Sequence, residues 1–355
     1  MAPVKQRTEP PYPLHPSVID RINPEYAAFY NEHLQDKQQV HLQPVEASRA
    51  GGGKIVLGAG KPEANVSVKD HLVLQDPRLC RNPGLMTGQD FPRIPIRIFT
   101  PMGQAPAAGW PLCFWFHGGG WVLGNIDTEN VITSRLSHAG KCVVITVDYR
   151  LAPEHRFPTA LEDCWQVFLW ATNDSNRDPV LRGINKKCVA VGGSSAGGNI
   201  AAAICQRQAG FSTWMPRLQF LSVPVLDNTA TAENNVSWRE NEFTPALPAA
   251  KMMWYREHYL PDPAQWCHPE ASPLLWKGNW GKLPPAVILV GELDVLRSEG
   301  QDFAKKMNAA GAKANVHVFK GQPHPFIAMD GALSDGRRAI EIFADALSNI
   351  LYQPE

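Results

Sequence analysis

Short apolar runs alternate with stretches of helical periodicity along most of this chain, beginning near residue 65. The runs are rich in β-branched and aromatic residues, and several are continuously apolar, which is typical of strands that helices cover on both faces. The predicted strands are 66–74, 94–100, 112–117, 142–148, 188–193, 218–223, 286–291 and 316–320. The predicted helices are 128–139, 159–170, 196–208, 298–310 and 334–351. This alternation predicts an α/β fold built on a mostly parallel sheet with helices on both faces.

Two segments, residues 1–60 and 226–275, do not follow this alternation. The second interrupts the series between the sixth and seventh predicted strands and is dense in tryptophan, tyrosine, phenylalanine and methionine. Most of these side chains are expected to pack the insertion onto the sheet, and the alternative is that some line a pocket. We therefore expect one domain, with a core of residues 61–225 and 276–355 and a cap made of the other two segments.

Composition and charge exclude several other classes of protein. Hydrophobic residues make up 44% of the 355 positions and charged residues 19%, as in an ordinary soluble enzyme. The 34 Lys and Arg residues balance 34 Asp and Glu residues, so nucleic-acid binding is not expected. We find neither a signal-peptide pattern in residues 1–17 nor an apolar run of membrane-spanning length. The seven cysteines lack metal-ligand or disulfide-framework spacing, so we expect free buried thiols and a cytoplasmic protein.

The fifth predicted strand runs into a turn with the sequence Gly193-Ser194-Ser195-Ala196-Gly197, which an apolar helical stretch follows. A serine hydroxyl is a poor nucleophile at neutral pH, so it must be exposed and oriented toward a base. A tight strand-to-helix turn provides that exposure, and its glycines permit close backbone approach. The five-residue pattern alone also arises by chance in Gly/Ser-rich turns. Its place between a strand and a helix makes Ser195 the candidate nucleophile.

The third predicted strand ends in a glycine run, HGGGW, at residues 117–121. Glycine amides can converge closely on a developing negative charge. We expect amides of Gly119 and Gly120, or of Gly118, to form an oxyanion hole with the amide of Ala196. A phosphate-binding or dinucleotide-binding loop is the alternative, but the run has neither the Gly-Lys-Ser/Thr ending nor the spacing of those motifs.

An acid and a histidine should follow the nucleophile, each after a later strand. The seventh predicted strand leads to Asp294 and the eighth to His324. In a triad with Ser195, His324 would accept the serine proton, and Asp294 would fix the imidazole tautomer. Glu292, two residues before Asp294, is the rival acid. We expect His117 to orient the glycine run and not to act as a base.

These residues together resemble the hormone-sensitive-lipase-like family of α/β-hydrolases, which includes bacterial esterases, arylacetamide deacetylases and plant carboxylesterases. The resemblance covers most of the chain from about residue 65 and rests on residues 117–121, 148–154, the Ser195 turn, 271–274, Asp294 and His324. It implies the α/β-hydrolase fold, hydrolysis of short to medium acyl esters, no cofactor, and a cap made of the two segments named above. The chain departs from the usual family residues at Ser194, Val295 and Pro325.

The sequence thus predicts a serine hydrolase that cleaves small to medium carboxylic esters through an acyl-enzyme on Ser195, without cofactor or metal. The proline-rich start and tryptophan-rich cap are similar to fungal family members that act on secondary metabolites, which would make an acetyl ester or a lactone the substrate. The candidate substrate-binding side chains are Trp121, Trp238, Phe243 and Phe326.

Two other functions remain open at this point. Relatives of this fold act as dehydratases or acyltransferases with nearly the same residues, and some plant members are hormone receptors. The receptor alternative is disfavoured because those members lack the catalytic histidine, and His324 is present here. We expect a small-molecule ester as the ligand, no nucleic-acid or membrane-spanning role, and a monomer or homodimer.

Overall fold

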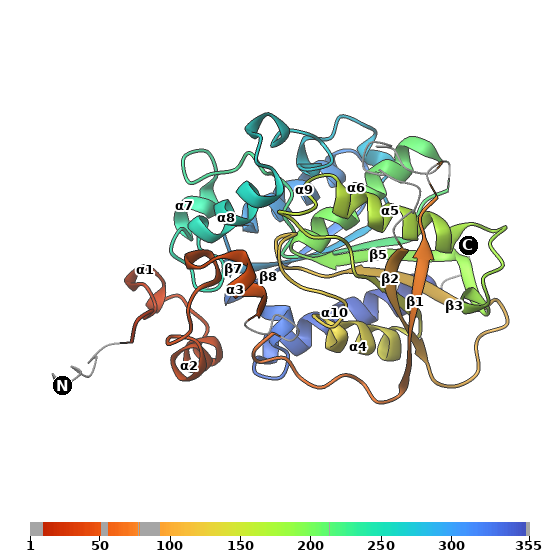
Figure 1. The fold of residues 1–355 in the computed structure, drawn as a ribbon, viewed down its shortest axis with the longest axis horizontal. Coiled ribbons are helices and arrows are strands. Elements are labelled where there is room, and N and C mark those ends of the chain that lie inside the picture. Colours follow the sequence, from red (N-terminus) through yellow and green to blue (C-terminus); the bar gives the residue numbers. More distant parts are fainter. Residues whose placement is uncertain (1–9, 51–55, 77, 79–92, 213, 353–355) are drawn as a thin grey trace.

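A single eight-stranded sheet forms the centre of the computed structural model, which describes residues 10–50, 56–76, 78, 93–212 and 214–352 (Figure 1). The strand order is β1-β2-β4-β3-β5-β6-β7-β8. β2 pairs antiparallel with β1 and β4, and the other neighbours are parallel. The strands are β1 (Val66–Leu74), β2 (Arg93–Pro101), β3 (Trp110–Phe116), β4 (Val143–Val147), β5 (Ile184–Ser194), β6 (Leu218–Ser222), β7 (Ala286–Leu293) and β8 (Ala314–Pro323). The expected mostly parallel α/β sheet is confirmed.

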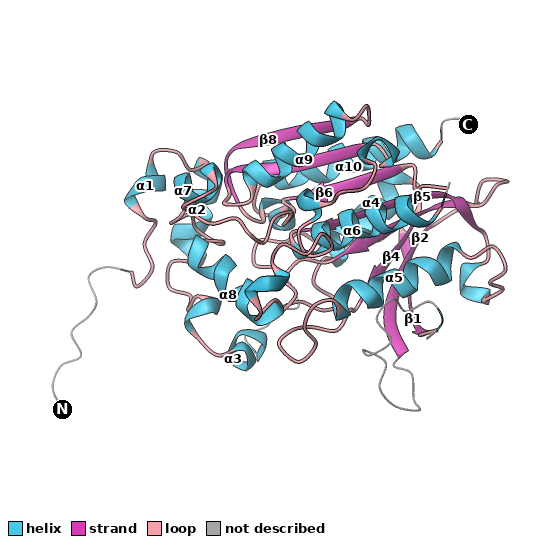
Figure 2. Cartoon of the chain, turned by 90° about the horizontal axis from the view of Figure 1, so that it is seen from above, coloured by secondary structure: helices cyan, strands magenta, loops and turns pink. Residues whose placement is uncertain are grey.

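Helices cover both faces of this sheet, as the continuously apolar strands predict (Figures 1 and 2). These helices are α4 (Asn130–Gly140), α5 (Thr159–Thr172), α6 (Ala196–Phe211), α9 (Arg297–Ala309) and α10 (Ser334–Leu351). α5, α6 and α9 pack on one face, and α4 and α10 pack on the other. Within β4, Val143 and Ile145 belong to the first core and Val144 to the second. An apolar side chain is needed at each position because neither face meets water.

Helix α4 begins at Asn130, two residues later than the sequence predicts. The backbone of Glu129 is not helical, with φ −124° and ψ 31°, and its side chain does not cap the helix. Its carboxylate instead accepts hydrogen bonds from Trp115 and from the amide of Gly118. Contacts with the glycine run therefore determine where α4 begins. Helical periodicity in the sequence does not reveal such contacts.

The two segments expected to form a cap lie on the same side of the molecule (Figure 1). Their helices are α1 (Pro16–Ile19), α2 (Pro24–His33) and α3 (Val45–Ala50), with α7 (Val236–Glu240) and α8 (Ala249–Tyr259) from the insertion. The Arg21 guanidinium joins the segments by donating to the carbonyl of Glu240 and to Asn241 Oδ1, both at 3.1 Å. Residues 1–9 and 51–55 of the first segment lie outside the described residues.

Arg49 of α3 ties the amino-terminal segment to the core. Its guanidinium donates to the carbonyls of Val122 and Ala152 and forms an ion pair with Glu154, with Nη1 and Oε1 2.7 Å apart. These acceptors lie in the loops after β3 and β4, so Arg49 ties both loops to α3.

The six described cysteines are free, and five of them are buried as expected. Cys267 is the exception, because it lies in an exposed turn of the insertion. Cys80 lies outside the described residues. None of the described helices is both long enough and apolar enough to cross a bilayer.

Candidate active site

Ser195 occupies a tight turn between β5 and α6. Its φ of 56° and ψ of −113° lie outside the conformations that L-residues ordinarily adopt. The flanking glycines are required by space, because a Cβ on Gly197 would lie 1.9 Å from the carbonyl oxygen of Phe116, and one on Gly193 would lie 2.4 Å from the carbonyl carbon of Gly197. The amide of Ser195 donates to the carbonyl of Ser222 on β6 at 2.8 Å. The sheet therefore holds this serine in a strained conformation.

This strain yields a prediction about stability. Ser195→Gly should unfold at a higher temperature than Ser195→Ala, because glycine adopts positive φ without the cost of about 1–2 kcal/mol that a Cβ brings. Both variants lack the hydroxyl, so their comparison isolates the backbone term. Thermal unfolding followed by circular dichroism measures the difference, and equal melting temperatures would contradict the proposed strain.

His324 and Asp294 form a hydrogen-bonded pair at the ends of β8 and β7. His324 Nδ1 lies 2.9 Å from Asp294 Oδ2, and Asp294 is fully buried. The second carboxylate oxygen, Oδ1, accepts from the amide of Leu296 at 2.9 Å, and Asn241 Nδ2 donates to the Asp294 carbonyl at 3.0 Å. With Nδ1–H donated to the carboxylate, the imidazole keeps a lone pair on Nε2. This arrangement gives His324 the tautomer of a general base.

Glu292, the rival acid, is engaged elsewhere. Its carboxylate accepts from the amide of Gly321 at 2.8 Å and from Lys320 Nζ at 3.0 Å. Both partners lie on β8 before its end, so the side chain ties β7 to β8 instead of meeting the imidazole. Of the two acids that the sequence left open, Asp294 is the one that contacts the His324 imidazole.

The glycine run after β3 presents two free amides beside Ser195. Gly119 and Gly120 both have positive φ, 109° and 60°. Neither their amides nor that of Ala196 donates to another described residue. Gly118 differs, because its amide donates to Glu129 Oε1 at 3.1 Å. The expectation that Gly118 could offer its amide to a substrate is therefore wrong in this structure, since that donor is already satisfied.

His117, the residue just before the glycines, contacts the same run and Tyr149. Its ring stacks on Tyr149, with centroids 4.2 Å apart and an interplanar angle of 9°, and its Nδ1 lies 2.7 Å from the carbonyl oxygen of Gly118. Tyr149 also donates its hydroxyl hydrogen to the His117 carbonyl at 2.7 Å. Burial lowers the pKa of His117 to about 4, so its ring is neutral at pH 7. His117 thus orients the loop, as predicted.

A cavity of about 180 Å³ brings these groups together. Ser195 and His324 both line it, with Gly118 and Gly119 of the glycine run. Its other described lining residues are Val56, Leu123, Gly124, Thr128, Glu129, Ser194, Pro325 and Ala328. Most of these walls are apolar. The described residues contain no group of three His, Cys, Asp or Glu side chains that could hold a metal ion.

The four side chains expected to bind substrate are not among the described residues that line this cavity. Trp121 is fully buried and stacks on Tyr259, with centroids 4.3 Å apart. Phe326 is fully buried, and its ring packs on Phe319 at 4.5 Å. Both side chains therefore serve the packing beneath the loops that carry them.

The two aromatic residues of the insertion also lie elsewhere. Trp238 is buried, its indole donates to Glu299 Oε1 at 3.0 Å, and its ring faces the Arg256 guanidinium 4.9 Å away. Phe243 stacks on His15, with centroids 4.4 Å apart, and lines a separate hollow between the two cap segments. The apolar density of the insertion thus reflects its attachment to the core, which is the first of the two interpretations given above.

Glu129 is the residue of this cavity that sequence reasoning missed. Burial raises the pKa of its carboxyl group to about 7, and interactions with Trp115, Gly118 and the Ser194 side chain oppose that rise. No local motif identifies Glu129, because its partners come from β3 and the glycine run. In the sequence, Glu129 is only a glutamate at the start of a predicted helix.

Comparison with known proteins agrees with this geometry. A family model described as the alpha/beta hydrolase fold matches residues 113–328. An AB hydrolase superfamily protein of Schizosaccharomyces pombe is 43% identical over 93% of this chain and 94% of its own length. An ethyl acetate hydrolase of Pseudomonas putida is 28% identical over 93% of this chain and 99% of its length. The crystal structure of an esterase from Pyrobaculum calidifontis superposes with a TM-score of 0.79 at 27% identity, covering 93% of this chain and 98% of that one.

The chain belongs to the alpha/beta hydrolase family. The fold class, the family and the enzyme class expected from the sequence, that of carboxylic-ester hydrolases, are confirmed by these comparisons.

Proposed function

We propose that this protein hydrolyses small carboxylic esters through an acyl-enzyme on Ser195. The observation that carries the proposal is the buried His324–Asp294 pair, with 2.9 Å between Nδ1 and Oδ2, in the same cavity as the strained Ser195. Nucleophile, base and acid follow each other in the chain order that this fold uses.

The reaction runs in two halves. His324 Nε2 takes the proton from Ser195 Oγ as that oxygen attacks the ester carbonyl carbon. The free amides of Gly119, Gly120 and Ala196 stabilise the resulting oxyanion. The tetrahedral species collapses, the alkoxide leaves with the proton from His324, and an ester bond to Ser195 remains. A water molecule then repeats the sequence, giving its proton to His324 and releasing the acid and the free serine.

The dimensions of the cavity support a small acyl group. The volume of about 180 Å³ among the described residues suits a small acyl group such as acetyl. Apolar walls at Leu123, Pro325 and Ala328 suit an uncharged group next to the carbonyl. We propose an acetyl ester or a lactone of a secondary metabolite as the substrate class. A relative named ethyl acetate hydrolase is consistent with the acetyl group.

A graded substrate series tests this proposal. p-Nitrophenyl acetate, butyrate and octanoate, with an acetylated polycyclic compound and a lactone, should give kcat/KM values that fall with acyl length. We expect acetate to exceed octanoate by about 100-fold, because a chain too long for the cavity holds the ester carbonyl away from the nucleophile, and a misplacement of about 1 Å costs roughly that factor. Equal or rising kcat/KM with length would contradict a small acyl pocket. Transfer of the acetyl group to an added alcohol, without release of acetate in water, would instead support the acyltransferase alternative.

A further inference from the structure

Glu129 joins the glycine run to the rigid centre of the sheet. One carboxylate oxygen, Oε1, accepts from the Gly118 amide at 3.1 Å, and the other, Oε2, accepts from the indole N–H of Trp115. Trp115 is fully buried on β3, whose neighbours β4 and β5 are both paired with it. Glu129 itself is only 7% exposed. The Glu129 carboxylate therefore fixes the Gly118 amide, the first of the glycine run, relative to β3.

The same carboxylate lies close to the nucleophile. A Cβ built on Gly118 would be 3.4 Å from Glu129 Oε1 and 3.5 Å from Ser195 Cβ. The Glu129 carboxylate and the Ser195 side chain therefore both lie next to Gly118. Gly118 is followed directly by Gly119 and Gly120, whose amides are free. A shift of Gly118 by a few tenths of an ångström would move these two donors with it.

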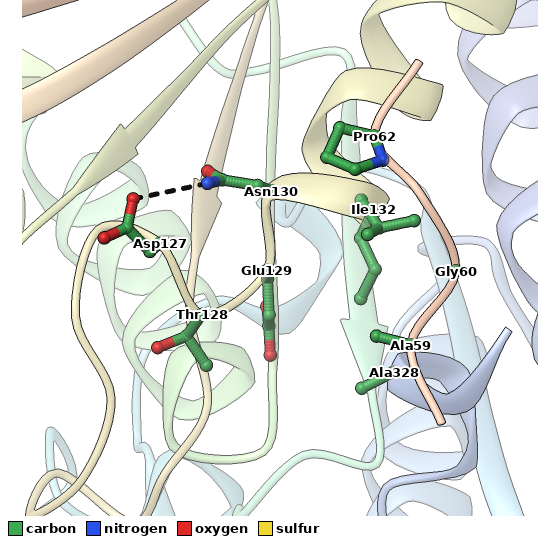
Figure 3. Close-up of a pocket in the computed structure, with 10 residues that line it drawn as sticks. Ala59, Gly60, Pro62, Asp127, Thr128, Glu129, Asn130, Ile132 and Ala328 are labelled. Atoms are coloured by element: carbon green, nitrogen blue, oxygen red, sulfur yellow. Dashed lines mark hydrogen bonds between the residues drawn. The ribbon is translucent and has the colours of Figure 1, made fainter. Parts of the chain in front are cut away.

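Figure 3 shows Glu129 from the side of a second cavity of about 190 Å³. This cavity and the one that contains Ser195 share Thr128, Glu129 and Ala328 as walls. In the view, the Glu129 side chain points down between Thr128 and Ala328, while Asn130 turns toward Asp127. The residues just before α4 thus border both cavities, and the Glu129 carboxylate lies between them and the glycine run.

We infer that Glu129 is a positioning residue for the oxyanion hole. By holding the Gly118 amide, its carboxylate aims the amides of Gly119 and Gly120 at the carbonyl oxygen of the substrate. The inference rests on the proposed esterase function, and Glu129 touches neither the ester nor the reacting atoms. Its contribution is to the preorganisation on which transition-state stabilisation depends.

Two acceptor oxygens are needed for this role. Glutamine offers one acceptor and one donor group, so in Glu129→Gln either Gly118 or Trp115 faces an N–H instead of an oxygen. The mismatch releases the glycine run or pushes it aside. Aspartate keeps both acceptor oxygens on a side chain shorter by one carbon, so we expect it to hold one of the two donors but not both.

The test compares three variants with the wild-type enzyme on p-nitrophenyl acetate. Glu129→Gln should lower kcat by about 10–100-fold with KM changed less than about threefold, because the lost interaction acts mainly in the transition state. Glu129→Asp should recover part of kcat. Asn130→Ala, which changes the neighbouring residue on the far side of the turn, should keep kcat within about twofold and serves as the matched control.

A trifluoromethyl ketone supplies a readout that a purely structural role would not move. Its adduct with Ser195 carries an oxyanion, so its affinity should fall in Glu129→Gln by the same factor as kcat/KM. Unchanged kcat and ketone affinity in folded Glu129→Gln would overturn the inference while leaving the esterase function intact. Should that variant fail to fold, Glu129→Asp decides, and wild-type values in it would overturn the inference equally. An absence of ester hydrolysis in the wild-type enzyme would overturn the proposed function itself.

Discussion

Ser195→Ala is expected to lower kcat for p-nitrophenyl acetate by about 10⁶-fold, which is the scale found when a triad serine is removed. The methyl group of alanine cannot attack the carbonyl carbon or form an acyl-enzyme. Residual hydrolysis would come from the oxyanion amides and from water activated by His324. Initial rates over a range of enzyme concentrations measure the loss.

Ser194→Ala is the matched control for this variant. Ser194 also lines the cavity, and its Oγ is buried, but it lies on β5 one residue before the turn. We expect its removal to cost less than about tenfold in kcat, since no described contact joins its Oγ to His324. A larger loss in Ser194→Ala than in Ser195→Ala would show that the nucleophile has been misassigned.

Asp294→Asn is expected to lower kcat by about 10⁴-fold with little change in KM. The asparagine amide can donate to His324 Nδ1, which favours the imidazole tautomer with its hydrogen on Nε2 and removes the lone pair that should receive the serine proton. The buried site also loses the negative charge that stabilises the imidazolium. Single-turnover measurements of p-nitrophenol release locate the loss in the acylation step.

Glu292→Gln is the matched control for Asp294→Asn, because Glu292 is the rival acid that the sequence places two residues before Asp294. Its ion pair with Lys320 is exposed on the lysine side, and such pairs contribute about 0–1 kcal/mol. We expect kcat within about threefold of the wild-type value, since the His324–Asp294 pair stays intact. The reverse ranking of the two variants would contradict the assignment of Asp294.

Much of the fold could be predicted from the sequence because hydrophobic periodicity reports burial directly. Each predicted strand corresponds to one of the eight observed strands, and β4 shows the reason, since Val143 and Val144 are buried on opposite faces. The ends of elements were less predictable. β5 starts at Ile184, where the residues are partly exposed and carry little apolar signal, and α4 starts late because Glu129 has partners elsewhere.

The convergence of Ser195, Asp294 and His324 at one edge of the sheet could be predicted, because each follows a strand whose place the fold dictates. The residues that line the pocket could not be predicted in the same way. Trp121, at the end of the glycine run, and Trp238, in the apolar insertion, were expected to meet substrate, yet stacking on Tyr259 and bonding to Glu299 occupy them. Which aromatic side chains a fold uses for its own packing depends on contacts between distant segments, and a single sequence does not report those contacts.

The position of Glu129 in the site could not be predicted for the same reason. Its donors, Trp115 and Gly118, lie 14 and 11 residues earlier in the chain, in a strand and a loop. A lone glutamate at the start of a predicted helix has the appearance of an ordinary first-turn acid. Only the three-dimensional arrangement shows that it faces away from that helix and toward the glycine run.

Covalent labelling by a fluorophosphonate tests the central claim most directly, because the reagent reacts with a serine only when a base and an oxyanion hole activate it. We predict that mass spectrometry of the digested enzyme will find one phosphonate on Ser195, with hydrolysis of p-nitrophenyl acetate lost in proportion. Ser195→Ala should remain unlabelled. An unreactive wild-type enzyme, or a label on another serine with Ser195 free, would contradict the assignment of Ser195, His324 and Asp294 as the catalytic residues.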